Sequence, residues 1–177
     1  MSLTVWLTGL PSSGKSTIAS AVADRIRPVR ATEILDGDVI RREFFPELGY
    51  SKDDRVENVR RIGGMAAMLA RNGVVVIVPV IAPYRSAREA VRRQHQDSGL
   101  GFVEVFVDAD LDTCMSRDVK GLYRRAVDGE ISGLTGYNDP YEPPEDPEVH
   151  LVTPHSSPEA CTDRLAEFIN QRLESRV

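Results

Sequence analysis

One short segment near the start of the chain constrains the fold more than any other. Residues 9–17 read Gly-Leu-Pro-Ser-Ser-Gly-Lys-Ser-Thr and follow the apolar run 4–7. They fit G-x-x-x-x-G-K-[ST] in the setting that this motif requires, a buried strand, a glycine-rich turn and a helix. Because a glycine has no Cβ, successive N–H groups of such a loop can face phosphate oxygens. An ordinary strand-turn-helix corner is the alternative, and the complete match in this setting disfavours it.

The loop therefore predicts binding of a nucleoside triphosphate. A helix that begins near Lys15 would add its positive N-terminal end. Lys15 would reach the β- and γ-phosphates, and the Ser16 hydroxyl would be a ligand of Mg²⁺. The phosphate-binding residues that we expect are Gly9, Ser12, Ser13, Gly14, Lys15, Ser16 and Thr17.

Length, charge and cysteine content narrow the class of protein. A chain of 177 residues suits a single domain, residues 1–177. Its net charge of −5 argues against a nucleic-acid binder. No apolar run approaches the roughly 20 residues of a membrane span, and the first strand begins too early to leave room for a signal peptide. Cys114 and Cys161 lack metal-binding spacing, so we expect two structural thiols in a reducing cytoplasm.

Short apolar runs alternate with helical patterns along the chain. The runs are rich in Val and Ile, as expected of strands buried on both faces: 4–7, 33–35, 74–81, 102–107 and, weakly, 149–152. The helical patterns are 16–26, 55–71, 86–96, 111–116 and 158–173. This alternation predicts an α/β fold, with a central parallel five-stranded sheet covered by helices on both faces. Ligands of such sheets bind beyond the carboxyl ends of the strands.

A long segment near the C-terminus has a different composition. Residues 121–147 carry three glycines after Gly121 and four prolines, with Asp and Glu between them. A loose surface loop is one interpretation. A long insert of this kind near a phosphate site is more often a lid, and we favour that interpretation.

Two carboxylates follow the second predicted strand. Asp36 and Asp38 are separated by one glycine. One carboxylate at such a place could hold Mg²⁺ through water, and the other could accept a proton from an attacking hydroxyl. We assign Asp36 to the metal together with Ser16. The alternative for one of the pair is an Asx-type turn that caps the next helix.

Basic residues gather in the segments that follow the predicted strands. A locally positive cleft on an acidic protein suits a small polyanionic substrate. Arg55 and Asn58 are one helical turn apart, so both can reach one ligand. A solvated helix face is an equally good interpretation of Arg60 and Arg61. The clustered arginines are Arg41, Arg42, Arg55, Arg60, Arg61 and Arg85.

Taken in order, the motifs resemble those of the adenylylsulfate kinase (APS kinase) family over essentially the whole chain. They are LDGD (35–38), DRVENVRRIG (54–63), VIAPY (80–84), RDVKGLY (117–123) and DPYE (139–142). The resemblance implies a P-loop NTPase fold. It also implies transfer of the γ-phosphate of MgATP to the 3′-hydroxyl of adenosine 5′-phosphosulfate (APS), which gives PAPS. A homodimer is common in this family and is expected here.

The resemblance also implies residue roles. Asp38 would orient or deprotonate the 3′-hydroxyl, with Lys15 as the other catalytic residue. Tyr50 would stack on the substrate adenine, and the backbone at Ile81 and Ala82 would contact it. Lys120 and Leu122 would close over the site, and Arg117 would pack on the adenine of ATP. The residues expected to bind the phosphosulfate and ribose are Arg41, Arg55 and Asn58.

The chain departs from the family pattern at several positions. Leu134 replaces the Phe that completes the aromatic sandwich on the substrate base, which should weaken stacking by roughly 1 kcal/mol. Ala82 replaces a common Ser, Val39 a common Asn and Arg42 a common His. These departures keep open a 3′-hydroxyl kinase for another 5′-modified nucleotide. A nucleotide-binding regulatory module without turnover is a further alternative, disfavoured because Lys15, Ser16, Asp38 and Arg55 are all retained.

Overall fold

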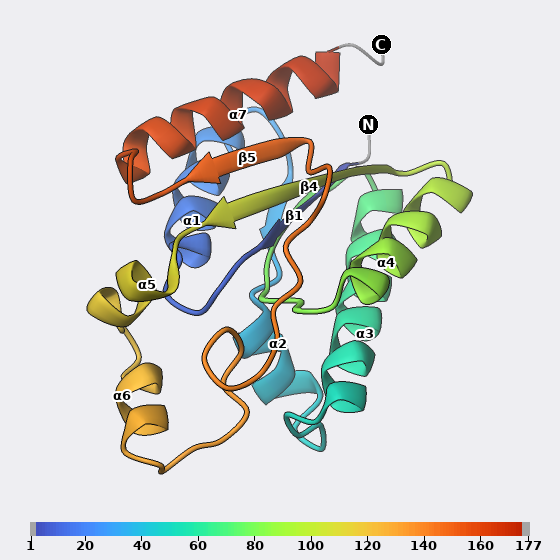
Figure 1. Ribbon diagram of the computed structural model, residues 1–177. Helices are drawn as coiled ribbons and strands as arrows, with labels where there is room; N and C mark the ends of the chain where they lie inside the picture. Colours follow the sequence, from blue (N-terminus) through green and yellow to red (C-terminus); the bar gives the residue numbers. More distant parts are fainter. Residues whose placement is uncertain (1–2, 175–177) are drawn as a thin grey trace.

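Five parallel strands form one sheet in the order β2-β3-β1-β4-β5 (Figure 1). The computed structural model describes residues 3–174. The central strand β1 pairs with β3 and β4 and is buried along its whole length. The predicted α/β class and the five-stranded parallel sheet are confirmed. The strands are β1 (Leu3–Thr8), β2 (Thr32–Ile34), β3 (Val75–Pro79), β4 (Gly101–Asp108) and β5 (Val149–Val152).

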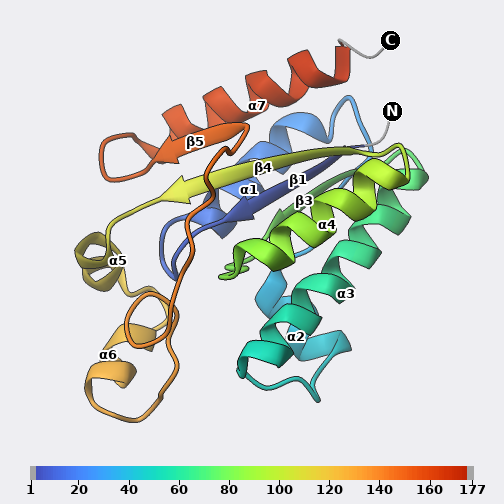
Figure 2. The same cartoon turned by 45° about the vertical axis from the view of Figure 1, so that its right-hand side comes forward.

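Helices cover both faces of the sheet because side chains alternate along each strand. Val5 and Leu7 pack in the core beneath α1 (Lys15–Ile26) and α7 (Pro158–Glu174). Trp6 points to the opposite face, where α2 (Gly37–Phe44), α3 (Lys52–Arg71) and α4 (Arg85–Asp97) contribute to the core. Figure 2 shows α3 and α4 side by side on this face.

A third, smaller core lies beyond the carboxyl end of β4. It joins α5 (Leu111–Arg117), α6 (Leu122–Val127) and the segment that returns to β5 (Figure 1). Its buried members are Ala109, Cys114, Tyr123, Ala126 and Leu134. We call residues 121–147 the lid segment. This core attaches the first part of the lid segment to the end of the sheet.

The boundaries differ from the sequence prediction where side chains cap the helices or the backbone turns. α3 begins at Lys52 rather than 55, because the Ser51 hydroxyl caps it by accepting from the backbone N–H of Asp54 at 3.2 Å. β3 ends at Pro79 rather than 81, and Ala82 with φ 43° turns the chain out of the sheet. Helices α2 and α6, which are 8 and 6 residues long, are not among those predicted from the sequence.

The two cysteines are unpaired and buried in helices α5 and α7. Burial raises the pKa of both thiols. Within residues 3–174, none of the helices has the length and apolar character needed to cross a membrane.

Candidate active site

A cleft of about 1070 Å³ opens at the carboxyl edge of the sheet. The loops after β1, β2 and β3 form one side of its lining, and residues of the lid segment form another. Every site residue predicted from the sequence lines this cleft except Gly9, the first residue of the phosphate loop. Parallel strands place their carboxyl ends at one edge, which brings these separate motifs together.

The phosphate loop depends on glycine at position 9. Gly9 has φ 155°, and a Cβ there would lie 2.3 Å from the carbonyl oxygen of Val107. Gly14 has φ 107° and precedes the first residue of α1. A side chain at Gly9 would therefore push the loop away from β4.

Lys15 lies folded against the phosphate loop. Its Nζ donates to the carbonyl oxygens of Gly9 at 2.9 Å and Leu10 at 2.7 Å. Burial lowers the pKa of the Lys15 ammonium to about 8, and the nearby Asp38 carboxylate opposes this shift. An incoming phosphate would supply the compensating negative charge that this buried cation lacks.

Asp36 has two roles, because its two carboxylate oxygens have different partners. Oδ1 accepts from the backbone N–H groups of Asp38 at 3.0 Å and Val39 at 3.4 Å, which makes Asp36 the N-cap of α2. Oδ2 accepts from the Ser16 hydroxyl at 2.8 Å. The predicted capping turn is thus present, and one carboxylate oxygen remains beside the hydroxyl expected to bind metal. Carboxylate and hydroxyl oxygens fit Mg²⁺, a hard cation that prefers oxygen ligands.

Asp38 and Lys120 form an ion pair between the first turn of α2 and the loop before the lid segment. The hydrogen bond to Asp38 raises the pKa of Lys120. Both side chains are more than half exposed, so a ligand can reach them. The pair places a carboxylate in the lining of the cleft that also holds the phosphate loop residues.

Arg55 is buried, and its donors are directed to backbone and lid atoms. Nε donates to the carbonyl oxygen of Tyr50 at 2.8 Å, and the terminal nitrogens donate to Thr135 and Gly133. Nη1 also lies 3.0 Å from Asp139 Oδ2. The predicted anion-binding arginine therefore contacts the lid segment directly.

Asn58 lies one helical turn beyond Arg55. Its side chain is buried, and Oδ1 has no hydrogen-bond partner within residues 3–174. A buried acceptor without a donor costs free energy, and a ligand hydroxyl or amine would satisfy it. The Arg55–Asn58 face therefore offers a charged donor and a vacant acceptor to one ligand.

Tyr50 and Arg41 stack on each other at the cleft mouth. The guanidinium carbon of Arg41 lies 5.0 Å from the centre of the Tyr50 ring, and Arg41 also donates to the carbonyl oxygen of Gly49. The Tyr50 side chain is largely exposed. One ring face thus carries the guanidinium, and burial lowers the pKa of Arg41.

The backbone at Ile81 and Ala82 lines the cleft with both carbonyl oxygens already engaged. Ile81 accepts from the Thr8 hydroxyl at 2.6 Å, and Ala82 accepts from Arg88 at 2.7 Å. Leu134 lines the cleft as well, yet it is buried in the core of the lid segment. Contact of Leu134 with a substrate base stays a prediction, because packing in this core is sufficient to explain an apolar residue at position 134.

Arg117 bridges the phosphate loop and the end of β5. It donates to the carbonyl oxygen of Ser13 at 3.3 Å and to the Thr153 hydroxyl at 3.1 Å. This position sets the guanidinium next to the loop where a triphosphate would lie. Thr153 also lines the cleft, although no motif in the sequence indicates it.

Three of the clustered arginines are engaged away from the predicted positive cleft. Arg60 and Arg61 both pair with Glu57 on α3. The solvated-face interpretation is correct for Arg60, whereas Arg61 is half-buried, also pairs with Glu47 and stacks on the Phe45 ring. Arg85 pairs with Glu145 at 2.6 Å. Their carboxylate partners become apparent only when the helix faces and the lid segment are placed in space.

A phosphate loop between β1 and α1, at the edge of a parallel sheet, defines a P-loop NTPase fold. A carboxylate and arginines that line the same cleft offer groups suited to the phosphate acceptor of a kinase. Residues 1–152 match the family model for adenylylsulphate kinase, and the chain belongs to this family.

Similar proteins agree with this membership along the chain. An adenylyl-sulfate kinase of Synechococcus sp. (strain JA-2-3B'a(2-13)) is 49% identical over 174 residues, covering 96% of this chain and 95% of the relative. One from Myxococcus xanthus is 44% identical over 168 residues, covering 95% and 91%. A solved structure of the Mycobacterium tuberculosis APS kinase CysC, in complex with AMPPNP and APS, has a TM-score of 0.88 at 40% identity and covers 98% of both chains.

Proposed function

We propose that this chain is an adenylyl-sulfate kinase that transfers the γ-phosphate of ATP to the 3′-hydroxyl of APS, giving PAPS and ADP. The observation that carries the proposal is the single cleft that joins the phosphate loop to Asp38, Arg41, Arg55 and Asn58. The similar M. tuberculosis enzyme, whose complex holds AMPPNP and APS, supports two nucleotide positions in one site.

The chain's own residues would do the chemistry mainly by positioning and charge. The loop amides and Lys15 hold the triphosphate, and Arg117 lies beside it. Asp38 orients the acceptor hydroxyl and takes up its proton. Lys120, paired with Asp38 in this structure, would close over the site beside it.

Ser16 and Asp36 would hold Mg²⁺, Asp36 through water. When bound, Mg²⁺ neutralises charge that develops on the phosphoryl oxygens. The 2.8 Å hydrogen bond between the Ser16 hydroxyl and Asp36 Oδ2 marks the place, because the two oxygens already converge.

The acceptor side would recognise APS through charge and through an apolar wall. Arg41 and Arg55 offer charge-assisted donors to the phosphosulfate, and Asn58 offers its vacant acceptor to the ribose. Tyr50, the Ile81–Ala82 backbone and Leu134 would enclose the adenine, and Leu122 would close over it with the lid segment.

Turnover with defined acceptors tests the proposal. We expect ADP release that depends on APS, with a product phosphorylated at the 3′-oxygen, and much poorer use of AMP. Equal use of AMP, or of another 5′-modified nucleotide, would favour the broader 3′-hydroxyl kinase. ATP binding without ADP release for any acceptor would favour a regulatory module.

We also propose a cytoplasmic homodimer. The unpaired, buried Cys114 and Cys161 suit a reducing compartment. A related APS kinase from Thiobacillus denitrificans, of whose chain this one covers 29%, is hexameric. Light scattering after size exclusion would give the mass in solution and test the dimer.

A further inference from the structure

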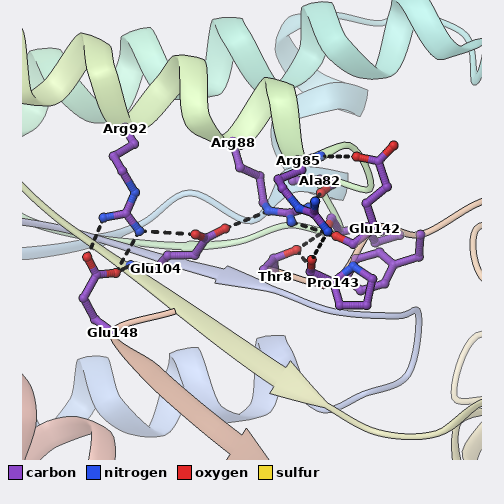
Figure 3. A network of polar contacts seen from close by, with 11 residues as sticks. Thr8, Ala82, Arg85, Arg88, Arg92, Glu104, Glu142, Pro143 and Glu148 are labelled. Atoms are coloured by element: carbon purple, nitrogen blue, oxygen red, sulfur yellow. Dashed lines mark hydrogen bonds and ion pairs between the residues drawn. The ribbon is translucent and has the colours of Figure 1, made fainter. Parts of the chain in front are cut away.

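A buried arginine on α4 joins the backbone of the cleft wall to the far end of the lid segment. Arg88 is 1% exposed, although arginine is rarely buried. Nη1 donates to the carbonyl oxygen of Ala82 and Nη2 to that of Glu142, both at 2.7 Å (Figure 3). Nε donates to Glu104 at 2.7 Å, which supplies the balancing charge. One guanidinium thus holds three elements together.

The cleft wall that Arg88 holds has a strained backbone. Ala82 has φ 43°, in the left-handed region that residues with a Cβ rarely adopt. Such a conformation persists only where the surroundings determine it. The three successive carbonyl oxygens of this turn are each held from outside: Ile81 by Thr8, Ala82 by Arg88 and Pro83 by the backbone N–H of Glu142 at 2.8 Å.

The end of the lid segment is fixed to the same region. We call residues 141–148 the strap. The Tyr141 hydroxyl lies 3.0 Å from the Thr8 hydroxyl, and its ring stacks on Phe106. Burial raises the pKa of Tyr141 to about 12, so the hydroxyl stays protonated.

Two further arginines of α4 hold the strap along its length (Figure 3). Arg85 donates its backbone N–H to Glu142 Oε2 at 2.7 Å and its guanidinium to Glu145 at 2.6 Å. Arg92 pairs with Glu148, which immediately precedes β5, and with Glu104. The strap is therefore attached to the sheet and to α4 by these contacts.

We infer that Arg88 is a positioning residue for the acceptor nucleotide. By holding Ala82 and Glu142 together it fixes the wall against which the acceptor base lies. The inference rests on the proposed function, because it takes the Ile81–Ala82 wall to face APS.

The test compares the same conservative change at two arginines of this network. In Arg88→Lys the ammonium can still pair with Glu104. It cannot also donate to the carbonyl oxygens of Ala82 and Glu142, as the planar guanidinium does. We expect the KM for APS to rise about tenfold, with the KM for ATP within about twofold of the parent value. Arg92→Lys is the matched control, one helical turn away and facing the same Glu104 without contacting Ala82 or Glu142. It should lower Tm and leave the KM for APS unchanged.

Amide hydrogen exchange gives a second readout that needs no turnover. Arg88→Lys should raise exchange in residues 80–84 and near Glu142. Arg92→Lys, whose strap contact is at Glu148, should leave exchange in residues 80–84 unchanged. If Arg88→Lys fails to fold, the paired change Arg88→Gln with Glu104→Gln removes both charges and tests the same contacts.

An unchanged KM for APS in folded Arg88→Lys, or an equal rise in the two variants, overturns the inference. Exchange at 80–84 that matches the parent also overturns it. Failure of the parent enzyme to use APS would instead refute the proposed function, and the exchange comparison would still decide whether Arg88 fixes the wall.

Discussion

Arg55 Nη1 lies 3.0 Å from Asp139 Oδ2, so the arginine expected to bind the substrate anion is already paired with a carboxylate of the lid segment. The Arg55 side chain is 8% exposed and that of Asp139 28%. An incoming phosphosulfate would meet both the cation and a like charge beside it. If Arg55 binds the phosphosulfate as proposed, Asp139 would stabilise the substrate-free protein and oppose anion binding.

Replacing Asp139 should have opposite effects on stability and affinity. We expect Asp139→Asn to lower the Tm of the free protein and to tighten APS binding by about fivefold, roughly 1 kcal/mol. Calorimetric titration of APS into the ADP-bound protein gives the affinity. Asp128→Asn is the control, because its carboxylate lies 4.0 Å from Arg124 on the surface. Weaker APS binding in Asp139→Asn would mean that Asp139 orients Arg55 for the substrate.

Removal of the Arg55 side chain should affect the KM for APS more than the KM for ATP. Arg55→Ala removes the charge expected to meet the phosphosulfate, so the KM for APS should rise far more than the KM for ATP. Initial rates at varied concentrations of each substrate measure the two constants. A parallel rise in both would indicate a general loss of lid order rather than lost anion recognition.

Lys15 predicts a pH dependence of nucleotide binding. Its pKa of about 8 in the free protein should rise when phosphates bind, so binding takes up a proton above pH 8. Affinity should be constant below about pH 8 and fall as the pH rises further. Calorimetry in buffers of different ionisation enthalpy counts the protons, and Lys15→Arg should abolish the uptake. Proton release on binding would contradict this assignment.

The lowered pKa of Lys15 also predicts how the free energy of unfolding depends on pH. Between pH 8 and the usual lysine pKa of 10.5, the unfolded chain holds a proton at Lys15 that the folded protein has lost. Deprotonation of Lys15 should therefore increase the free energy of unfolding as the pH rises through that window. Lys15→Ala, which should also lower turnover by several orders of magnitude, would remove the contribution.

Substitution of the two carboxylates after β2 should have different effects, on stability for Asp36 and on turnover for Asp38. Asp36 caps α2, so Asp36→Ala should cost about 1 kcal/mol of unfolding free energy. Asp38 pairs only with the exposed Lys120 among its side-chain contacts in residues 3–174, so Asp38→Asn should leave Tm nearly unchanged and collapse turnover. Tm and the turnover rate of the two variants decide this. Near-normal turnover in Asp38→Asn would refute its role with the acceptor hydroxyl.

Neighbouring glycines of α3 should respond in opposite directions. A Cβ at Gly63 would lie 2.7 Å from a methyl carbon of Val91 on α4, whereas a Cβ at Gly64 meets nothing within 4 Å. Gly63→Ala should cost about 1–3 kcal/mol by overpacking. Gly64→Ala should gain about 0.5–1 kcal/mol, because alanine favours the helix. Urea unfolding gives both values, and a neutral Gly63→Ala would show that α4 can move aside.

The sequence alone determined that the chain has a phosphate-binding site, because the residues of that motif are adjacent in the chain. The phosphate loop needs only a strand, two glycines and a helix start within about a dozen residues, and all lie together in the chain. The alternation of strands and helices determined the parallel sheet, and the capping turn at Asp36 was among the alternatives. The motifs from residue 35 to 142 also indicated the family, which the comparisons confirm.

Only the tertiary structure decided which charges face the cleft and which partners they have. Arg55 meets atoms 78 and 80 residues away, and Arg88 meets Glu142 across 54 residues. Arg60 and Arg61 are neighbours of Arg55 in sequence yet pair with Glu57 on α3. Periodicity and spacing specify the local backbone and the face on which a residue lies. The pairing of two distant side chains depends instead on how sheet, helices and lid segment pack, and no short stretch of sequence encodes that.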